Sequence, residues 1–231
     1  MRDSQVARWT AVAGIAGTLL TLGGFSVFIF RAGFPPNTDS EAALAAFLRS
    51  ENASIQTGVL LFFVAFAVWF VFFAGLRALI AGASPRLEYL GTAIFGLGAA
   101  FLAQSFIFMG MEAAATANAL TRPDNSVIYG LFMGGSVLDG APVAVTIAAL
   151  LGVSGWALYR SRLLSSWAAW LSWVMAIVVV ATLPALYQGD DLKGTYSADG
   201  LVADVLVFVP LYVWTLAVSI AVIRKAPAVQ S

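Results

Sequence analysis

Acidic side chains set in long apolar segments are the groups in this sequence best suited to chemistry. Glu112 ends one such segment, Asp139 stands in the Gly- and Pro-containing stretch 134–142, and Asp204 lies about one turn into the last segment. If these segments cross a membrane, an ionised side chain at a helix centre costs about 2.5–3.5 kcal/mol on insertion scales, so each is a functional hypothesis by default. We therefore predict all three as candidate ligand-binding groups for a cation, a proton or a polar ligand, although Asp204 could equally favour the positive end of its helix.

Two further polar residues complete the candidate ligand-binding set. Gln104, in the outer half of the third apolar segment, is a neutral group well placed to face a cavity that contains Asp139. Arg31 ends the first segment and offers a partner to Glu112, as does Arg122. For Glu112 we favour an interfacial ion pair over a binding role, because its position corresponds to a membrane boundary, where a charge costs little.

The residue types that are missing exclude most familiar catalytic and metal centres. The chain has no His and no Cys, so zinc, haem and iron–sulfur sites lose their usual ligands, and Ser–His and Cys–His nucleophilic pairs are impossible. The sequence has no phosphate loop, nucleotide fingerprint, zinc-protease helix or nucleophile elbow, and no basic face suits a nucleic acid. We therefore predict no catalytic residues, no metal and no cofactor, and a membrane enzyme ranks third among the functions considered.

The composition places these polar residues in an integral membrane protein. Apolar residues make up 61% of the 231 residues and charged residues 10%, and the mean hydropathy is +0.90. A typical soluble domain is about 45–50% apolar and about 25% charged. Because about 20 apolar residues cross a ~30 Å hydrocarbon core as a helix, we predict an all-α bundle, a single domain over 1–231. Its six transmembrane helices lie at about 8–31, 54–78, 89–111, 127–159, 166–187 and 200–223.

The fourth segment is too long for one straight span, and the stretch 134–142 interrupts it. In one interpretation, a short outer helix ends near Gly134, and Asp139 caps a second helix that has Pro142 near its start and spans the membrane by itself. In the other, one broken helix begins at Val127, and Asp139 lies well below the membrane surface, as in the discontinuous helices of transporters. We favour the first interpretation.

The basic residues predict which helix ends face the cytoplasm, because Lys and Arg concentrate in cytoplasmic loops. With six crossings, eight of the twelve basic residues fall on the side of the two chain termini. These eight are Arg2, Arg8, Arg77, Arg86, Arg160, Arg162, Arg224 and Lys225. We therefore predict a multi-pass protein with both termini cytoplasmic.

Residues 39–50 predict a short amphipathic helix on the outer surface. Thr38 and Glu41 have the spacing of a capping box, and Leu44, Phe47 and Leu48 then share one helical face. We expect this helix to cover the outer end of the bundle, with a lid over a cavity as the alternative.

The distribution of small and aromatic residues predicts how the spans pack. Glycine and alanine cluster in the first and third spans, and such residues allow helix backbones to approach closely in lipid. The second span is rich in phenylalanine instead. We expect the first and third spans near the centre of the bundle and the second span on its lipid-facing outside.

One stretch carries a family resemblance. Residues 155–171, Gly-Trp-Ala-Leu-Tyr-Arg-Ser-Arg-Leu-Leu-Ser-Ser-Trp-Ala-Ala-Trp-Leu, resemble the end of the fourth helix in the uncharacterised bacterial six-helix membrane proteins of domain-of-unknown-function family 4386. In that family a Gly-Tyr-Leu-x-x-Arg-Ser run precedes Pro-Arg-Trp-Leu-Gly, in place of which this chain has Ser-Ser-Trp-Ala-Ala. The Arg-Trp-Thr-Ala-Val-Ala-Gly run at 8–14 and the Ala-rich outer helix are also similar. The resemblance implies six helices with cytoplasmic ends in a bacterial inner membrane, and it brings no known activity.

These observations favour a non-enzymatic function in the membrane. We predict either an accessory subunit of another membrane protein or a binder of lipid or another apolar ligand. The expected partners are therefore membrane lipids and, for the accessory role, a second membrane protein. The alternative is a small-solute transporter with its site in the outer half of the bundle, around Asp139, Glu112 and Gln104.

Overall fold

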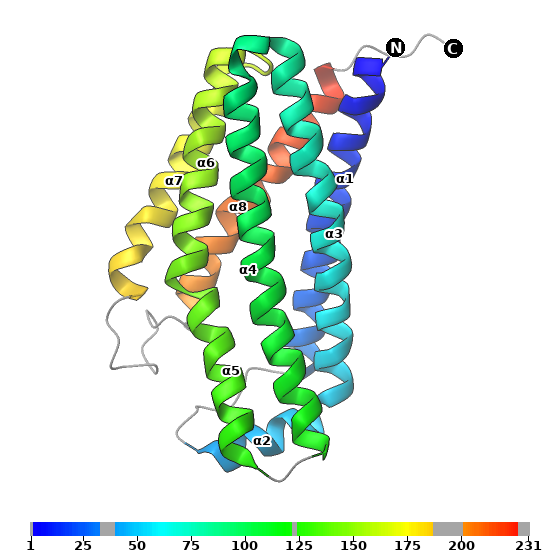
Figure 1. Cartoon of the computed structure of the whole chain (residues 1–231), viewed down its shortest axis with the longest axis vertical. Coiled ribbons are helices and arrows are strands. Elements are labelled where there is room, and N and C mark those ends of the chain that lie inside the picture. The colour runs from blue at the N-terminus through cyan, green and yellow to red at the C-terminus, as the bar shows by residue number, and fades with distance from the viewer. Residues whose placement is uncertain (1, 33–39, 122–123, 187–200, 226–231) are drawn as a thin grey trace.

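The computed structural model describes residues 2–32, 40–121, 124–186 and 201–225, and over these ranges it is helical apart from short turns, with no strand (Figure 1). The elements in chain order are α1 (Arg2–Phe25), the π-helical η1 (Ser26–Arg31), α2 (Glu41–Ser50), α3 (Asn52–Ala83), the 3-10 helix η2 (Pro85–Leu87), α4 (Glu88–Thr121), α5 (Asn125–Asp139), α6 (Ala141–Ser161), α7 (Ser166–Leu186) and α8 (Leu201–Lys225).

Six helical stretches within the described ranges are long and apolar enough to cross a membrane. They are Ser4–Phe28, Asn52–Ala83, Pro85–Thr121, Asn125–Ser161, Ser166–Leu183 and Val205–Lys225. The predicted fold class, an all-α bundle of six transmembrane helices, is therefore confirmed. The fourth stretch consists of α5 and α6 together, with a break between them, as the excess length of this segment predicted.

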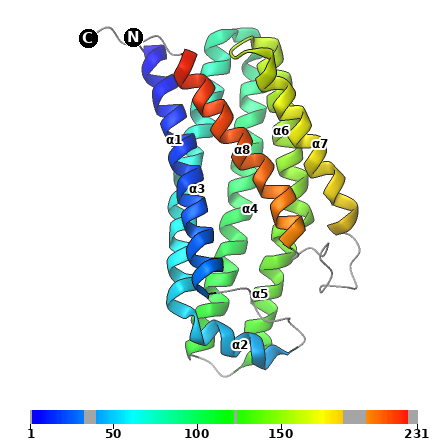
Figure 2. The ribbon, with the colours of Figure 1, turned by 180° about the vertical axis from the view of Figure 1, so that it is seen from behind.

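The two ends of the bundle are built differently. α1 begins and α8 ends at one end, which we call the termini end, and α2 lies at the opposite end, which we call the α2 end (Figure 1). α8 runs obliquely across the back of the bundle and contacts α7, α6 and α1 (Figure 2). Because α7 and α8 stop short of the α2 end, the bundle is thickest in its half nearer the termini end (Figures 1 and 2).

Exposed aromatic side chains mark the membrane boundary at the termini end. Six of them lie in helix turns near this end and expose between 44% and 69% of their surface, namely Trp9, Tyr89, Trp156, Tyr159, Trp167 and Trp170. Tryptophan and tyrosine gather at membrane–water interfaces because their rings are amphipathic. A ~30 Å hydrocarbon core corresponds to about 20 helical residues, which locates the other boundary near Met109 in α4 and Asp139 at the end of α5.

Four helical segments project beyond this second boundary, and we call them the headpiece: α2, residues 52–57 of α3, residues 110–121 of α4, and α5 (Figure 1). The apolar core of the bundle continues between them, through the buried side chains of Leu44, Leu48, Ile55, Ala115, Ala119, Ile128 and Phe132. The third predicted span therefore continues about ten residues past its expected end, because α4 is stabilised there by protein contacts rather than by lipid.

The predicted amphipathic helix is confirmed as α2. Leu44 and Leu48 are buried, and α2 contacts α4 and α5, so the apolar face covers the headpiece instead of lying on lipid. The helix begins later than the predicted capping box, because Ser40 is its N-cap and accepts a hydrogen bond from the Ala43 amide at 3.3 Å. Thr38 lies outside the described residues.

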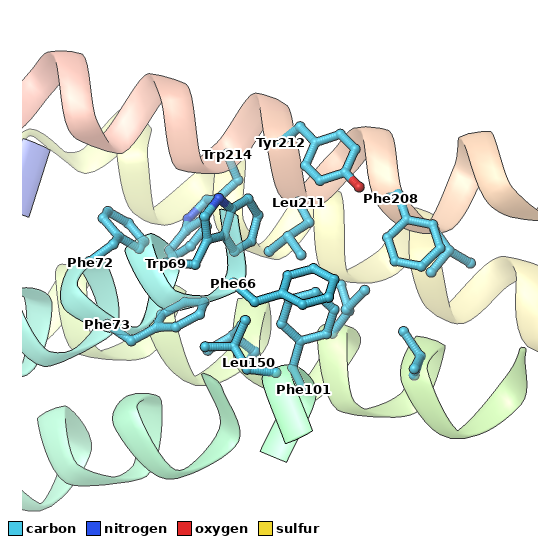
Figure 3. Packing of buried hydrophobic residues seen from close by; sticks show 14 of the residues in the cluster. Phe66, Trp69, Phe72, Phe73, Phe101, Leu150, Phe208, Leu211, Tyr212 and Trp214 are labelled. Carbon is cyan, nitrogen blue, oxygen red and sulfur yellow. The ribbon is translucent and has the colours of Figure 1, made fainter. Parts of the chain in front are cut away.

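Five of the seven aromatic side chains of α3 are buried and form the centre of the bundle, which corrects the prediction that this helix lies on the outside. Of the other two, Phe70 is 46% exposed and Phe63 is partly buried. Trp69 is 1% exposed, Phe72 and Phe73 are fully buried, and α3 lies in contact with both α1 and α4. Figure 3 shows the Trp69 ring among aromatic side chains of neighbouring helices; its centroid is 5.9 Å from those of Phe101 and Tyr212.

Glycines on the neighbouring helices explain why these aromatic rings fit inside. A methyl group added at Gly17 would overlap the Trp69 indole, and each of four aromatic residues of α3 occupies the space in front of a glycine. The pairs are Gly14 with Phe72, Gly17 with Trp69, Gly24 with Phe62, and Gly98 with Phe73. The glycine-rich spans and the phenylalanine-rich span therefore form the two sides of one interface. Each glycine leaves a notch on its helix, and because a ring of α3 fits into that notch, the two backbones can approach closely.

We expect Gly17→Ala to destabilise the protein by about 1–3 kcal/mol, because the added methyl forces the Trp69 ring out of its place. Gly23→Ala is the matched control on the same helix, since a methyl there meets no atom within 4 Å, and alanine is the better helix former. Thermal unfolding of both variants in one detergent, followed by circular dichroism, measures the difference. Equal losses of stability in the two variants would contradict the notch packing.

Candidate functional site

The break between α5 and α6 lies at Gly140, which has φ −72° and ψ −120°. Gly140 is the N-cap of α6 and makes no side-chain cap, and Pro142 lies in the first turn of this helix, where the missing amide hydrogen of proline costs nothing. The prediction that Asp139 caps this helix is therefore wrong, since Asp139 is the last residue of α5. The outer helix also ends at Asp139 and not near Gly134, whereas α6, at ~31 Å, is long enough to span the membrane by itself as predicted.

Asp139 and Glu112 lie along the same contact between α5 and α4. A Cβ atom built on Gly135 of α5 would be 3.2 Å from the Phe108 carbonyl oxygen and 3.6 Å from the Glu112 Cγ atom, and Asp139 follows Gly135 by one helical turn. Side chains lean towards the N-terminus of their own helix. Because α4 and α5 are antiparallel, the two carboxylates lean towards each other.

Both carboxylates are partly shielded from water. Asp139 and Glu112 are half-buried, and Oδ1 of Asp139 and Oε2 of Glu112 are buried atoms. Both lie close to the membrane boundary at the α2 end, where the cost of a charge is smaller than at the membrane centre. Carboxylates placed in this way can bind a proton or a small cation.

Gln104 lies level with Asp139 across the same contact. Gly135 faces Phe108. Because the two helices are antiparallel, four residues forward from Gly135 and four residues back from Phe108 bring Asp139 opposite Gln104. The Gln104 side chain is half-buried, and its Oε1 atom is buried without a hydrogen-bond partner among the described residues. The structure therefore groups three of the five predicted ligand-binding residues, and their role in binding stays a prediction.

The other two predicted residues do not join this group. Arg31 is exposed at the end of η1, and η1 packs on α1 and α3, with no backbone contact to α4 or α5 in the described part of the chain. Asp204 is in the first turn of α8, but its side chain lies outside the described residues, as does Arg122. Within the described ranges, no group of three or more His, Cys, Asp or Glu side chains could hold a metal ion.

A row of side-chain donors in the headpiece was not predicted from the sequence. Arg49 Nε donates to the Ala119 carbonyl oxygen at 2.7 Å, and the Asn52 and Gln56 side-chain amides donate to carbonyl oxygens of α4 at 2.9 and 3.0 Å. We call these three hydrogen bonds the donor ladder. Arg49 lies in the last turn of α2, and Asn52 and Gln56 lie in the first turns of α3. The acceptors are backbone atoms, so the sequence of α4 carries no sign of these hydrogen bonds.

The start of α5 is fixed by a charged cap. Asp124 is its N-cap, and the Ser126 hydroxyl donates to Oδ1 at 2.7 Å. This hydrogen bond, with those from the Val127 and Ser126 amides, holds the pKa of the Asp124 carboxyl below its usual value of 3.8. The carboxylate is therefore ionised at neutral pH and stabilises the positive end of the helix.

An apolar groove between α1 and α3 opens on the side of the bundle. Its volume is about 560 Å³, and all its lining residues are apolar: Trp9, Val12, Ala13, Ala16, Phe63, Val64, Ala67, Val68 and Val71. The hollow forms where small side chains, Ala16 and Ala67 among them, lie between larger ones. Sequence reasoning missed it because a groove depends on how two helices are rotated against each other.

Comparison with known proteins adds no family to these observations. A scan against protein-family models finds no match, and neither a search of curated proteins nor a search of solved structures finds a similar chain. The resemblance of residues 155–171 to a bacterial membrane-protein family therefore stays a prediction.

We expect Asn52→Ala to lower the free energy of unfolding by about 1 kcal/mol, because it removes a hydrogen bond that joins α3 to α4. Asn118→Ala is the matched control: the Asn118 amide donates to Ala114 of its own helix, so its loss leaves the two helices joined. Thermal unfolding in detergent compares the two. A control variant that loses as much stability as Asn52→Ala would show that the donor ladder does not hold the headpiece together.

Proposed function

We propose that the protein binds membrane lipid, with one acyl chain lying in the groove between α1 and α3. The observation that carries this proposal is the wholly apolar lining of a groove that opens sideways at membrane depth. An acyl chain is the occupant because lipid tails are the molecules that always surround this part of a membrane protein. The role is non-enzymatic.

The dimensions of the groove support a single lipid chain from one leaflet. The lining residues run from Trp9 to Ala16 on α1 and from Phe63 to Val71 on α3, which corresponds to about 10–12 Å along the helices. One leaflet of the hydrocarbon core is about 15 Å deep. Because Trp9 belongs to the aromatic boundary at the termini end, the groove runs from that boundary towards the membrane centre.

Packing explains why an acyl chain binds in the groove in preference to remaining among the other acyl chains of the bilayer. Helix and lipid are equally apolar, so binding within the membrane gains nothing from the hydrophobic effect and depends on close contact. A chain in the groove contacts both walls, whereas an empty groove forfeits dispersion contacts along its lining. The same reasoning holds whether the protein acts alone or as an accessory subunit of a second membrane protein.

A small-solute transporter is the second candidate function. The grouping of Asp139, Glu112 and Gln104 along the α4–α5 contact favours it, because converging polar groups can bind a proton or a cation. Transporter sites typically lie near the membrane midplane, whereas this group lies near a boundary. We therefore rank lipid binding first.

We also propose that the protein resides in the cytoplasmic membrane of a bacterium, with the termini end facing the cytoplasm. The excess of basic residues at that end supports this orientation. The family resemblance of residues 155–171 supports the bacterial assignment.

In the test of orientation, cysteines replace the exposed Ser165 at the termini end and the exposed Ser50 at the α2 end, one at a time, in a chain that has no natural cysteine. A membrane-impermeant maleimide added to intact cells should label Ser50→Cys and leave Ser165→Cys unlabelled until the cells are opened. The reverse pattern would place the termini end outside the cell.

In the test of the groove, Ala16→Phe fills the hollow, and we expect it to remove one retained lipid per protein. Ala100→Phe is the matched control, since Ala100 is exposed on α4 and lies outside the groove lining. Native mass spectrometry of the purified proteins counts the lipids retained after equal washing in detergent. A wild-type protein without retained lipid, or an Ala16→Phe protein with the wild-type number, would overturn the proposed function.

A further inference from the structure

Polar side chains stand at the end of the groove that meets the membrane boundary. Gln5 and Arg8 are exposed on the first turns of α1. Gln5 precedes the groove-lining Trp9 by one helical turn, and Arg8 precedes Val12 by one turn. Because side chains of a helix lean towards its N-terminus, both point away from the membrane centre, to the depth at which lipid headgroups lie.

The opposite wall leaves room for a headgroup. Ala78 and Gly82 are exposed on α3 and continue the groove-facing side of that helix towards the termini end, and a methyl group at Gly82 would meet no atom within 4 Å. Arg77 of the same helix contacts Glu88 of α4 at 3.3 Å, so its guanidinium is engaged away from the groove.

Near this end of the groove, the described side chains of the two walls carry the positive charge of Arg8, besides that of the paired Arg77. Asp3 is the one acid of α1, and its side chain lies outside the described residues, while α3 contains no Asp and no Glu. A phosphate group would find the Arg8 guanidinium and the Gln5 amide as donors, and Arg pairs well with phosphate through parallel hydrogen bonds. A positively charged choline or ethanolamine group would find no carboxylate among the described side chains of the two walls.

We propose that the lipid bound in the groove is an anionic phospholipid, with its headgroup on Arg8 and Gln5 and one acyl chain between α1 and α3. This inference rests on the proposed lipid-binding function and adds the headgroup class to it. Arg8 supplies the selectivity, and the groove supplies the contact with the chain.

The experiment titrates purified, delipidated protein in detergent with phosphatidylglycerol and, separately, with phosphatidylcholine of the same acyl chains, and it follows binding by native mass spectrometry. We expect the wild-type protein to prefer phosphatidylglycerol. Arg8→Gln should bind phosphatidylglycerol about tenfold more weakly and lose much less affinity for phosphatidylcholine, because the phosphate of phosphatidylcholine is already balanced by its own choline charge. Arg8→Lys should keep part of the preference, because it keeps the charge but loses the paired donors. Thermal unfolding confirms that each variant is folded.

Arg86→Gln is the matched control, since Arg86 is an exposed arginine of η2 at the same end of the bundle and lies outside the groove. It should keep the wild-type preference. An Arg8→Gln protein that still prefers phosphatidylglycerol, or an Arg86→Gln protein that loses the preference equally, would overturn the headgroup assignment. Ala16→Phe separates the two proposals, because loss of both lipids in that variant upholds the groove even where the headgroup assignment fails.

Discussion

The insertion of aromatic rings from α3 into glycine notches on α1 and α4 is the contact on which the rest of the bundle depends. In lipid, helices gain no hydrophobic energy from associating, so a bundle must be held by close packing. Trp69 in front of Gly17 and Phe73 in front of Gly98 bring three helix backbones together. The same insertion sets the rotation of α1 against α3. Gly14 and Gly17 face inwards, so Trp9, Val12 and Ala16 face outwards and line the groove. Core packing and the candidate lipid site therefore have one origin.

Much of the fold could be predicted from the sequence because it depends on properties of single segments. Length and apolar content predict the six spans, and the spacing of Leu44 and Leu48 predicts the amphipathic α2. The failures concern relations between segments. The phenylalanines of α3 were expected to face lipid, because bulk alone does not show that Gly17 and Gly98 offer matching notches. Asp139 was expected to be a cap, although the adjacent Gly140 holds that position without a side chain. The groove and the donor ladder left no local pattern to recognise.

The position of a polar side chain relative to the membrane boundary determines how its hydrogen-bonding groups are satisfied. The donor ladder, Glu112 and Asp139 all lie at or beyond the boundary at the α2 end, where water is near and charge costs less. Hydroxyl groups inside the membrane, such as those of Thr18 and Thr21, donate to carbonyl oxygens of their own helix instead. This division explains why the grouping of two acids and Gln104 is compatible with a stable fold.

The donor ladder has a consequence for how freely this protein can change over evolutionary time. Its three donors are side chains, whereas its acceptors are backbone carbonyl oxygens of α4. A carbonyl group is the same in every residue type, so only the side chains of α2 and α3, and not those of α4, determine whether these hydrogen bonds form. Substitutions at Ala113, Thr116 and Ala119 leave the acceptors in place as long as the new side chain fits. Selection is therefore expected to retain Arg49, Asn52 and Gln56. The facing residues of α4 can be replaced by any residue whose side chain fits.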